Sequence, residues 1–259
     1  MSIIKPKKKL GQHFLNDLNI GKKIVESLKL DNYNRVLEIG PGKGILTQFI
    51  IEKKINLNLV EIDKECVNYL NKKYPLIKNK IINEDFLKLD LNKIFKNDSF
   101  AIIGNFPYNI SSQIIFKVID YRDKVPYLTG MFQKEVAERI CHDPGSKKYG
   151  ILSVLTQLFY ETKYLFSVNP SVFEPKPKVN SAVIELKRKK NYNLNCNETL
   201  LFKIIKLSFR QRRKTLRNSL KKLDLPLFLT EDTIFEKRPE QLSGKDFVEI
   251  SKMINNVKS

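Results

Sequence analysis

The sequence predicts a parallel α/β sheet followed by a smaller helical domain. Short apolar runs alternate with helical segments as far as about residue 187, and a glycine-rich turn joins the first run to the first helix. Beyond residue 198 only helical periodicity remains. Parallel strands need helical crossovers, so this alternation favours a doubly wound sheet. At 259 residues the chain is long enough for one large domain and a small appendix.

The elements follow from periodicity and from the Gly and Pro residues that interrupt it. The predicted strands are 35–39, 57–62, 80–83, 100–104, 127–132, 164–168 and 182–187, and the predicted helices are 45–54, 64–73, 111–120 and 151–160. A Pro-rich loop, 169–179, separates the last two strands, and the polar, Asn-rich stretch 188–197 is typical of a linker. We therefore expect a first domain of residues 1–187, a linker of residues 188–198 and a helical domain of residues 199–259.

The net charge of +19 favours a polyanionic partner, and nucleic acid is the natural one. The chain is also rich in Lys, Asn and Ile, a bias that an AT-rich genome produces without selection for binding, so total charge alone is weak support. Arginine is more specific. Four of the nine arginines, Arg210, Arg212, Arg213 and Arg217, fall within eight residues.

Composition also excludes several classes of protein. No stretch approaches the roughly 20 apolar residues of a membrane helix, and the basic N-terminus is not followed by the apolar core of an export signal. The three cysteines and two histidines lack the spacing of a disulfide framework or a zinc site. We expect a cytoplasmic protein with no metal ion and no membrane contact, and nothing in the sequence demands more than a monomer.

The glycine loop Gly40–Gly44 is the first candidate binding motif. Such a turn lets the backbone approach a nucleotide-like ligand at the carboxyl ends of the strands. Glu61 ends the second strand, about 20 residues further on, where a carboxylate accepts ribose hydroxyls. Asp85 follows the third strand and can accept from an adenine amino group. Taken singly, the loop is equally consistent with a tight turn, and each acid alone is more often a solvated loop carboxylate.

Two cofactors are compatible with this loop. A nicotinamide dinucleotide prefers G-x-G-x-x-G, whereas Gly40, Gly42 and Gly44 give G-x-G-x-G. Glu38, directly before the loop, also fits poorly beside a diphosphate. A carboxylate there suits a cationic amino acid moiety, so the residues favour S-adenosylmethionine.

The tetrapeptide Asn105-Phe106-Pro107-Tyr108 follows the fourth strand and has the features of a site for an exocyclic amine. An amine conjugated to a purine ring is a poor nucleophile, because its lone pair is delocalised. The Asn105 side-chain oxygen and the Phe106 carbonyl, held by Pro107, can accept both amino protons, and Tyr108 offers a ring for stacking. By itself a motif this short is more often a turn after a strand.

The C-terminal segment has a cationic stripe if Leu201–Lys221 is helical. Leu201, Ile205, Phe209, Leu216 and Leu220 then share one face beside a basic one. Arg212 falls within the apolar face, which indicates a buried ion pair. A charged stripe is also typical of a merely solvated face, but 206–222 holds eight basic residues and no acid. The predicted contacts to nucleic-acid phosphates are Lys206, Arg210, Arg213, Lys214, Arg217 and Lys221, with Lys5 and Lys7–Lys9 as a second contact.

Four motifs together resemble the ribosomal RNA adenine N6,N6-dimethyltransferase family. They are Lys9–Asp17 at the N-terminus, the glycine-loop segment Glu38–Thr47, the tetrapeptide Asn105–Tyr108, and Phe173–Ser181 before the last strand. They span nearly the whole chain in the family's order. The resemblance implies a Rossmann-like class I methyltransferase sheet, mostly parallel with its last strand antiparallel, and a small all-helical C-terminal domain that binds RNA.

The resemblance also implies roles for particular residues. The cofactor contacts it implies are His13, Leu15, Gly40, Glu61, Asp85 and Asn105, to which the residue chemistry adds Glu38 and Gly42. Phe173 matches the aromatic residue expected to press on the target base opposite Tyr108. Many relatives have Asn in place of His13 and Leu or Ile in place of Phe106. Because Phe106 contributes its carbonyl, we expect that substitution to leave the chemistry intact.

The family contains several activities, and the flanking motifs favour one of them. Gly11-Gln12, Pro41, Gln133–Arg139, Tyr149–Val154 and Phe209 with Arg212–Leu216 resemble the branch that dimethylates two adjacent adenosines in the terminal hairpin loop of small-subunit ribosomal RNA. The expected partner is therefore that RNA or an immature small ribosomal subunit. The alternatives are the large-subunit branch that confers antibiotic resistance, DNA adenine methylation, and a non-catalytic assembly factor on the same scaffold.

Overall fold

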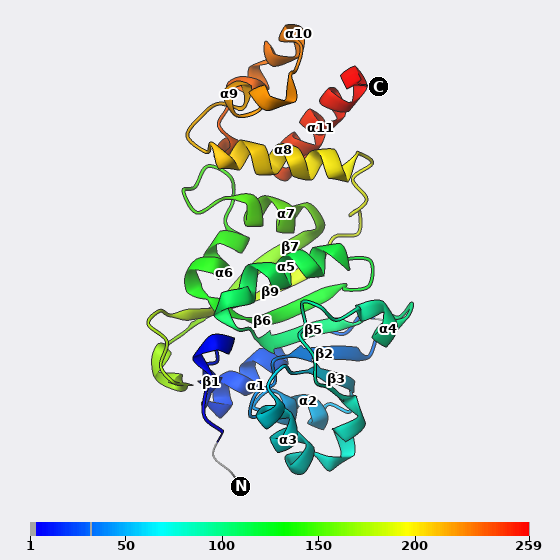
Figure 1. The fold of residues 1–259 in the computed structure, drawn as a ribbon, viewed down its shortest axis with the longest axis vertical. Helices are drawn as coiled ribbons and strands as arrows, with labels where there is room; N and C mark the ends of the chain where they lie inside the picture. Colours follow the sequence, from blue (N-terminus) through cyan, green and yellow to red (C-terminus); the bar gives the residue numbers. More distant parts are fainter. Residues whose placement is uncertain (1–3, 32, 259) are drawn as a thin grey trace. The chain divides into compact units, whose positions relative to one another are not determined.

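The computed structural model describes residues 4–31 and 33–258, and a seven-stranded sheet is its central feature (Figure 1). The strand order is β4-β3-β2-β5-β6-β9-β7. The strands are β2 (Arg35–Ile39), β3 (Asn56–Val60), β4 (Ile81–Ile82), β5 (Ala101–Asn105), β6 (Tyr127–Gln133), β7 (Tyr160–Val168) and β9 (Ser181–Arg188). All seven predicted strands are present, with ends that differ by a few residues.

The pairing confirms the predicted sheet. β4, β3, β2, β5 and β6 are parallel to one another, and β9 is antiparallel to β6. Because the first β–α turn follows β2, an inner strand of this sheet, β3 and β5 flank β2 on opposite sides. The carboxyl ends of β2, β3 and β5 therefore meet at one edge, where folds of this kind bind ligands.

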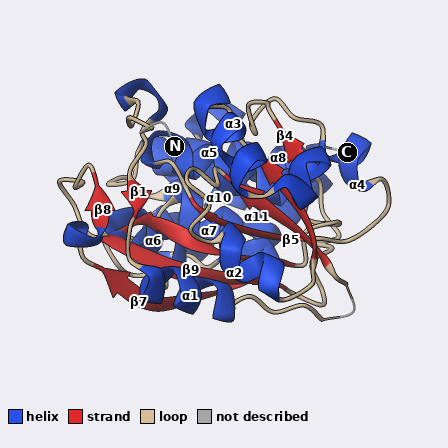
Figure 2. Ribbon diagram, turned by 90° about the horizontal axis from the view of Figure 1, so that it is seen from below, coloured by secondary structure: helices blue, strands red, loops and turns tan. Residues whose placement is uncertain are grey.

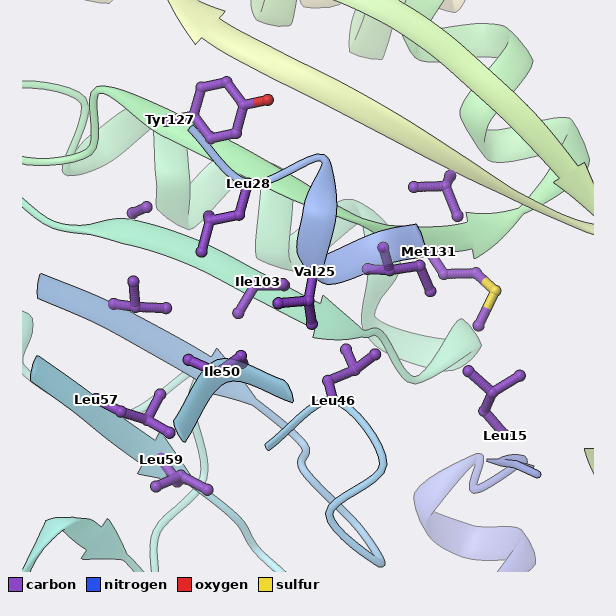
Figure 3. Packing of buried hydrophobic residues seen from close by; sticks show 14 of the residues in the cluster. Leu15, Val25, Leu28, Leu46, Ile50, Leu57, Leu59, Ile103, Tyr127 and Met131 are labelled. Carbon is purple, nitrogen blue, oxygen red and sulfur yellow. The ribbon is translucent and has the colours of Figure 1, made fainter. Parts of the chain in front are cut away.

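Helices cover the sheet and close the core. Ile102 and Ile103 of β5 are both fully buried, and successive strand residues point to opposite faces, so both faces are covered. Figure 3 shows one cluster, in which Val25, Leu46 and Ile103 pack together. The helices are α1 (Leu18–Glu26), α2 (Thr47–Glu52), α3 (Lys64–Lys73), α4 (Leu91–Phe95), α5 (Ser111–Asp120), α6 (Lys134–Cys141), α7 (Ile151–Phe159), α8 (Glu198–Arg210), α9 (Leu216–Ser219), α10 (Leu227–Thr230) and α11 (Gly244–Lys258).

Some of these elements were not predicted from the sequence. Helix α1 begins after Asp17, whose side chain accepts a hydrogen bond from the Ile20 amide at 3.0 Å, as an N-cap does. The Pro-rich loop also contains a strand, β8 (Phe173–Glu174), which pairs antiparallel with β1 (Phe14–Leu15), as Figure 2 shows. This pair joins the N-terminal segment to a region that lies about 160 residues later in the sequence.

The chain divides into two compact units, residues 1–137 with 162–188, and residues 138–161 with 189–259. The sequence predicted a first domain of residues 1–187, which includes residues 138–161, whereas these residues lie in the second unit. They belong to the second unit because α7 packs against α8 and α11. Between β9 and α8, residues 189–197 form no helix or strand. No helix among residues 4–31 and 33–258 is long and apolar enough to cross a membrane.

The predicted helix 201–221 is wrong as a single element. Helix α8 ends at Arg210, a turn follows, and the chain resumes as the short helix α9. The apolar positions Leu201, Ile205, Leu216 and Leu220 are nonetheless buried. The helical repeat therefore predicted which residues are buried in this unit, although the cationic residues do not form one continuous stripe.

Candidate active site

A pocket lies at the carboxyl ends of β2, β3 and β5, within the first unit. Its walls are the N-terminal segment 10–15, the glycine loop 40–43, Glu61 with Ile62, and the tetrapeptide 105–108. Segments from four separate parts of the sequence thus meet at the edge where the sheet topology predicted a site. The predicted contacts His13, Leu15, Glu38, Gly40, Gly42, Glu61 and Asn105 all line it.

The glycine loop has a backbone that only glycine adopts without strain. Gly40 and Gly42 have φ values of +64° and +55°. A Cβ on Gly42 would also lie 3.0 Å from two carbons of the Phe14 ring. The loop therefore needs glycine both for its backbone conformation and for the close packing of the Phe14 ring. The main chain of Gly40 and Gly42 lines the pocket.

Glu61 is buried at the end of β3 and is already bonded to main chain. Its Oε2 accepts from the Gly42 amide at 3.0 Å and its Oε1 from the Asp63 amide at 2.9 Å. Burial raises the pKa of Glu61, while these two hydrogen bonds favour its charged form. A carboxylate oxygen can accept more than one hydrogen bond, so Glu61 can fasten the glycine loop and still accept from a ligand.

Glu38 is the other buried acid of the pocket. It is 1% exposed, and one oxygen accepts from the Thr47 hydroxyl at 2.7 Å. Burial raises the pKa of Glu38 to about 8. A buried carboxyl group of this kind ionises readily once a cation lies beside it, because the opposite charge offsets the cost of desolvation. The site therefore suits a ligand with a positively charged group.

Asn105 has a fixed side-chain orientation. Its Nδ2 donates to the main-chain carbonyl oxygen of His13 at 2.9 Å. An amide that uses its nitrogen in this way has its oxygen, Oδ1, at the opposite end as an acceptor. Asn105 lines the pocket, so the N-terminal segment sets the polarity of this side chain.

Phe106 is a core residue whose side chain is 1% exposed. Its ring occupies space left by two glycines that are paired across β5 and β6, Gly104 and Gly130. A Cβ on Gly130 would lie 2.3 Å from a ring carbon of Phe106. The ring therefore packs in the core, while the Phe106 carbonyl is the group for which the sequence predicted a role. Pro107, with φ of −58°, then sets the direction of the chain into the turn.

Tyr108 is held on two sides. Its hydroxyl hydrogen-bonds the Ser181 hydroxyl at 2.5 Å, and its ring stacks with the His13 ring at 5.2 Å between centroids and an interplanar angle of 26°. Burial raises the pKa of Tyr108, so the hydroxyl stays protonated. His13 in turn donates from Nδ1 to the Pro175 carbonyl oxygen at 2.7 Å. These contacts place the Tyr108 ring in one orientation at the pocket.

Two predicted site residues lie elsewhere in this structure. Phe173 does not line the pocket. Its ring is 3% exposed in the apolar core, because the β1–β8 pairing sets it beside Leu15. Asp85 is likewise absent from the pocket walls, and its Oδ1 accepts from the Leu87 amide at 2.9 Å. The aromatic ring that does lie against Tyr108 is that of His13.

Asp63, whose side chain binds the N-terminal segment through Lys7 and Gln12, was not identified from the sequence. Asp63, the N-cap of α3, has a fully buried side chain that lies 2.5 Å from the Lys7 ammonium and 2.9 Å from the Gln12 amide nitrogen. These contacts hold Asp63 ionised, and its pKa is lowered even though burial opposes this. The position of Asp63 directly before a helix was the available signal, since Asp is common at N-caps.

In the second unit, the predicted RNA-contacting side chains are all exposed: Lys206, Arg210, Arg213, Lys214, Arg217 and Lys221. Arg212 differs. Its Nε lies 2.6 Å from Glu240 Oε2, and its NH2 group donates to the Ser146 carbonyl oxygen at 3.0 Å. The ion pair inferred from its place in the apolar face is therefore present, although both side chains are partly exposed rather than fully buried.

The parallel sheet, its antiparallel β9 and the pocket at the first β–α turn define an α/β fold of the class I methyltransferase type. The crystal structure of a dimethyladenosine transferase from Plasmodium falciparum has this fold, with a TM-score of 0.81 and 28% identity over 94% of this chain and 98% of that one. A crystal structure of the 23S rRNA methyltransferase ErmE gives a TM-score of 0.70 and 25% identity, over 92% and 99%.

The family follows from sequence comparison. The model of the family "Ribosomal RNA adenine dimethylase" matches residues 3–255. The chain is 56% identical to a ribosomal RNA small subunit methyltransferase A of Flavobacterium johnsoniae, over 98% of this chain and 97% of the relative. It is 55% identical to the protein of that name from Parabacteroides distasonis, over 97% and 94%. The chain therefore belongs to the ribosomal RNA adenine dimethylase family.

Proposed function

We propose that this protein transfers methyl groups from S-adenosylmethionine to the N6 amino groups of two adjacent adenosines in the 3′-terminal hairpin loop of small-subunit ribosomal RNA. The relatives at 55% and 56% identity are named as small-subunit methyltransferases, which supports the choice of RNA. The observation that carries the chemistry is the hydrogen bond from Asn105 Nδ2 to the His13 carbonyl oxygen. It leaves the Asn105 oxygen as the acceptor that an amine requires.

The residues of the pocket fit this cofactor. When bound, S-adenosylmethionine supplies a methyl group on a positively charged sulfur. The buried Glu38 suits the cationic amino acid end, because a counter-charge lets this carboxyl group ionise. The glycine loop offers main chain at close range, since Gly40 and Gly42 have positive φ values and both line the pocket. Glu61 keeps acceptor capacity for ribose hydroxyls, and Asp85 is proposed to accept from the adenine amino group.

The tetrapeptide acts on the substrate amine. Asn105 Oδ1 and the Phe106 carbonyl accept the two amino protons, which returns electron density to the nitrogen and directs its lone pair away from the ring. Tyr108 supports the base by stacking, which contributes about 1–3 kcal/mol per base. Alignment is the main contribution, because a held near-attack geometry removes much of the entropic barrier. The proton leaves to water, since a methylated amino nitrogen is strongly acidic.

The second unit is proposed to bind the RNA backbone. Its exposed cations are suited to phosphate contacts, which give affinity that falls with salt. We propose an immature small ribosomal subunit as the substrate particle, because the two adjacent adenosines must be unpaired and accessible for extrusion.

The test is transfer of labelled methyl groups to small subunits that lack the modification, followed by mapping of the modified nucleotides. We expect dimethyladenosine at two adjacent positions. Asn105→Ala is expected to abolish transfer and retain RNA binding, whereas Asn109→Ala, exposed and outside the pocket walls, retains both. Transfer only to large-subunit RNA or to duplex DNA would contradict the proposal. Subunit assembly supported equally well by the inactive Asn105→Ala protein would favour the assembly-factor alternative.

A further inference from the structure

The turn after β4 has an unusual arrangement of main-chain groups. The Asp85 carbonyl oxygen accepts from the amides of Lys88 and Leu89 at 3.0 and 3.1 Å, and the Asp85 side chain accepts from Leu87. Residues 85–89 therefore form a tight turn, in which the Leu87 amide holds the Asp85 side chain by a hydrogen bond. The carbonyl groups of Phe86, Leu87 and Leu89 are left to find partners outside the turn.

One side chain supplies all three partners. The Lys117 ammonium group donates to the Phe86 carbonyl oxygen at 2.6 Å, to that of Leu87 at 3.1 Å, and to that of Leu89. An ammonium group has three donors, so its whole hydrogen-bonding capacity is spent on this turn. Burial lowers the pKa of Lys117, and the charges of Asp85 and Asp90 oppose that shift. The cation is thus bound among carbonyl dipoles and nearby acids.

The tetrapeptide 105–108 comes just before the helix that carries Lys117. The chain runs from Tyr108 through one 3-10 turn, Tyr108–Ile110, directly into α5. At the other end of α5, the Tyr121 hydroxyl donates to Asp90 at 3.1 Å. Helix α5 therefore holds the segment 86–90 at two points, and it spans the distance between the proposed amine site and the turn that carries Asp85.

We propose that Lys117 is a positioning residue that holds Asp85 for recognition of the adenine 6-amino group of the cofactor. Its role rests on the proposed use of S-adenosylmethionine. By binding the carbonyl groups of the turn, Lys117 sets where the Asp85 carboxylate stands relative to the tetrapeptide. Loss of the ammonium group frees three carbonyls to turn toward water, and the Asp85 side chain moves with them. The effect is on cofactor affinity and on selectivity for a 6-amino purine.

The experiment measures binding of S-adenosylhomocysteine to the full chain by calorimetry. Lys117→Met keeps the aliphatic stem and removes the donors, and is expected to bind this ligand about ten-fold more weakly, which corresponds to loss of one well-placed hydrogen bond. The turnover rate at saturating cofactor stays within about two-fold, since the tetrapeptide is intact. Lys117→Arg retains the charge and is expected to regain most of the affinity.

A second ligand and a matched control isolate the positioning role. S-inosylhomocysteine has a 6-oxo group instead of the 6-amino group, so Lys117→Met is expected to bind it as the unchanged protein does. Lys124→Met is the control, because Lys124 also donates to a main-chain carbonyl, that of Lys96, outside the pocket walls. It is expected to bind both ligands normally. Thermal unfolding of each variant confirms that binding is measured on folded protein.

Three outcomes would overturn the inference. One is unchanged S-adenosylhomocysteine affinity in Lys117→Met, and another is an equal loss for both ligands, which would indicate a general effect on the fold. The third is an equal loss in Lys124→Met. In all three the unchanged protein still binds S-adenosylhomocysteine, so the proposed cofactor stands. Failure of the unchanged protein to bind this ligand would instead remove the proposed function and the inference together.

Discussion

The Asn105 amide nitrogen lies 2.9 Å from the His13 carbonyl oxygen, so a main-chain group of the N-terminal segment sets the orientation of the proposed catalytic amide. The His13 side chain has other partners, the Tyr108 ring and the Pro175 carbonyl oxygen. The His13 main chain thus orients Asn105, whereas the His13 side chain contacts Tyr108 and Pro175. A substitution at His13 removes the side-chain contacts and keeps the main-chain contact.

His13→Ala is expected to reduce methyl transfer by about ten-fold, because it removes one ring stack and one hydrogen bond. It keeps the main-chain contact to Asn105, so the loss is far smaller than that of Asn105→Ala. Steady-state kinetics with RNA and cofactor varied separately measures this difference. A His13→Ala protein as inactive as Asn105→Ala would mean that the imidazole itself takes part in the chemistry.

Gly130→Ala is expected to destabilise the protein by about 1–3 kcal/mol, since overpacking costs that much in a filled core. The added methyl group would lie 2.3 Å from the Phe106 ring and 2.7 Å from the Gly104 carbonyl oxygen. Methyl transfer is expected to fall as well, because displacing the Phe106 ring also displaces the Phe106 carbonyl that is proposed to bind the substrate amine. Urea unfolding measures the stability change. Gly150→Ala is the control, because no heavy atom beyond its chain neighbours lies within 4 Å of the added carbon.

A second substitution tests the cause of that loss. The double variant Gly130→Ala with Phe106→Leu has a smaller side chain at the crowded position, so it is expected to recover part of the stability and of the activity. No recovery would show that the clash with the Gly104 carbonyl oxygen, not with the ring, dominates.

The raised pKa of Glu38 leads us to expect that the stability of the protein depends on pH. Burial raises the pKa of Glu38 from 4.5 to about 8. Between these values the folded protein holds a proton that the unfolded chain has released, so this contribution to stability falls as pH rises from about 4.5 to 8 and is then constant. Glu38→Gln is expected to remove that part of the dependence, as seen in urea unfolding across the range. An identical pH profile in the variant would contradict the assignment.

The same carboxyl group predicts proton release on cofactor binding. A cationic ligand group beside Glu38 favours the ionised form, so the complex loses a proton that the free protein holds at pH 7. Calorimetry with S-adenosylhomocysteine in buffers of different ionisation enthalpy measures the number released. Affinity is expected to rise with pH through about 8, and Glu38→Gln is expected to bind more weakly without this linked release.

Arg212 and Arg213 are adjacent in sequence and are expected to differ in their effects. Arg212→Leu breaks the contacts with Glu240 and Ser146 and is expected to cost about 1 kcal/mol of stability, a modest value because the pair is partly exposed. Arg213→Leu leaves stability unchanged but weakens RNA binding and lowers its salt dependence. Unfolding and RNA titrations at several salt concentrations test both. Equal effects on RNA affinity would contradict the distinction.

Local patterns in the sequence predicted most of the catalytic unit. The apolar runs identified every strand of the main sheet, because a buried parallel strand needs a continuous apolar segment. The glycine loop, Glu38, Glu61 and Asn105 were placed at the pocket by their positions at the carboxyl ends of three strands. Such residues are fixed by the topology of a doubly wound sheet, so their spacing along the chain is sufficient.

Contacts between distant segments were predicted less well. Phe173 was expected beside the base, but the β1–β8 pairing places its ring in the core. The hydrogen bond between Lys7 and Asp63 joins residues 56 positions apart in the sequence. The hydrogen bonds of Lys117 to the turn after β4 join residues about 30 positions apart. Helical periodicity also extended α8 beyond Arg210, because a repeat of buried residues continues through the turn into α9.

The sequence by itself determined the sheet, the edge at which the pocket forms, and the residue types that line it. These depend on short-range patterns of apolar residues, glycines and acids, which act over one strand and one turn. Only the tertiary structure decided how those groups are oriented: the direction of the Asn105 amide, the ring against Tyr108, the partner of Arg212 and the ammonium group that holds the Asp85 turn. Each of these depends on hydrogen bonds and packing between segments far apart in the chain.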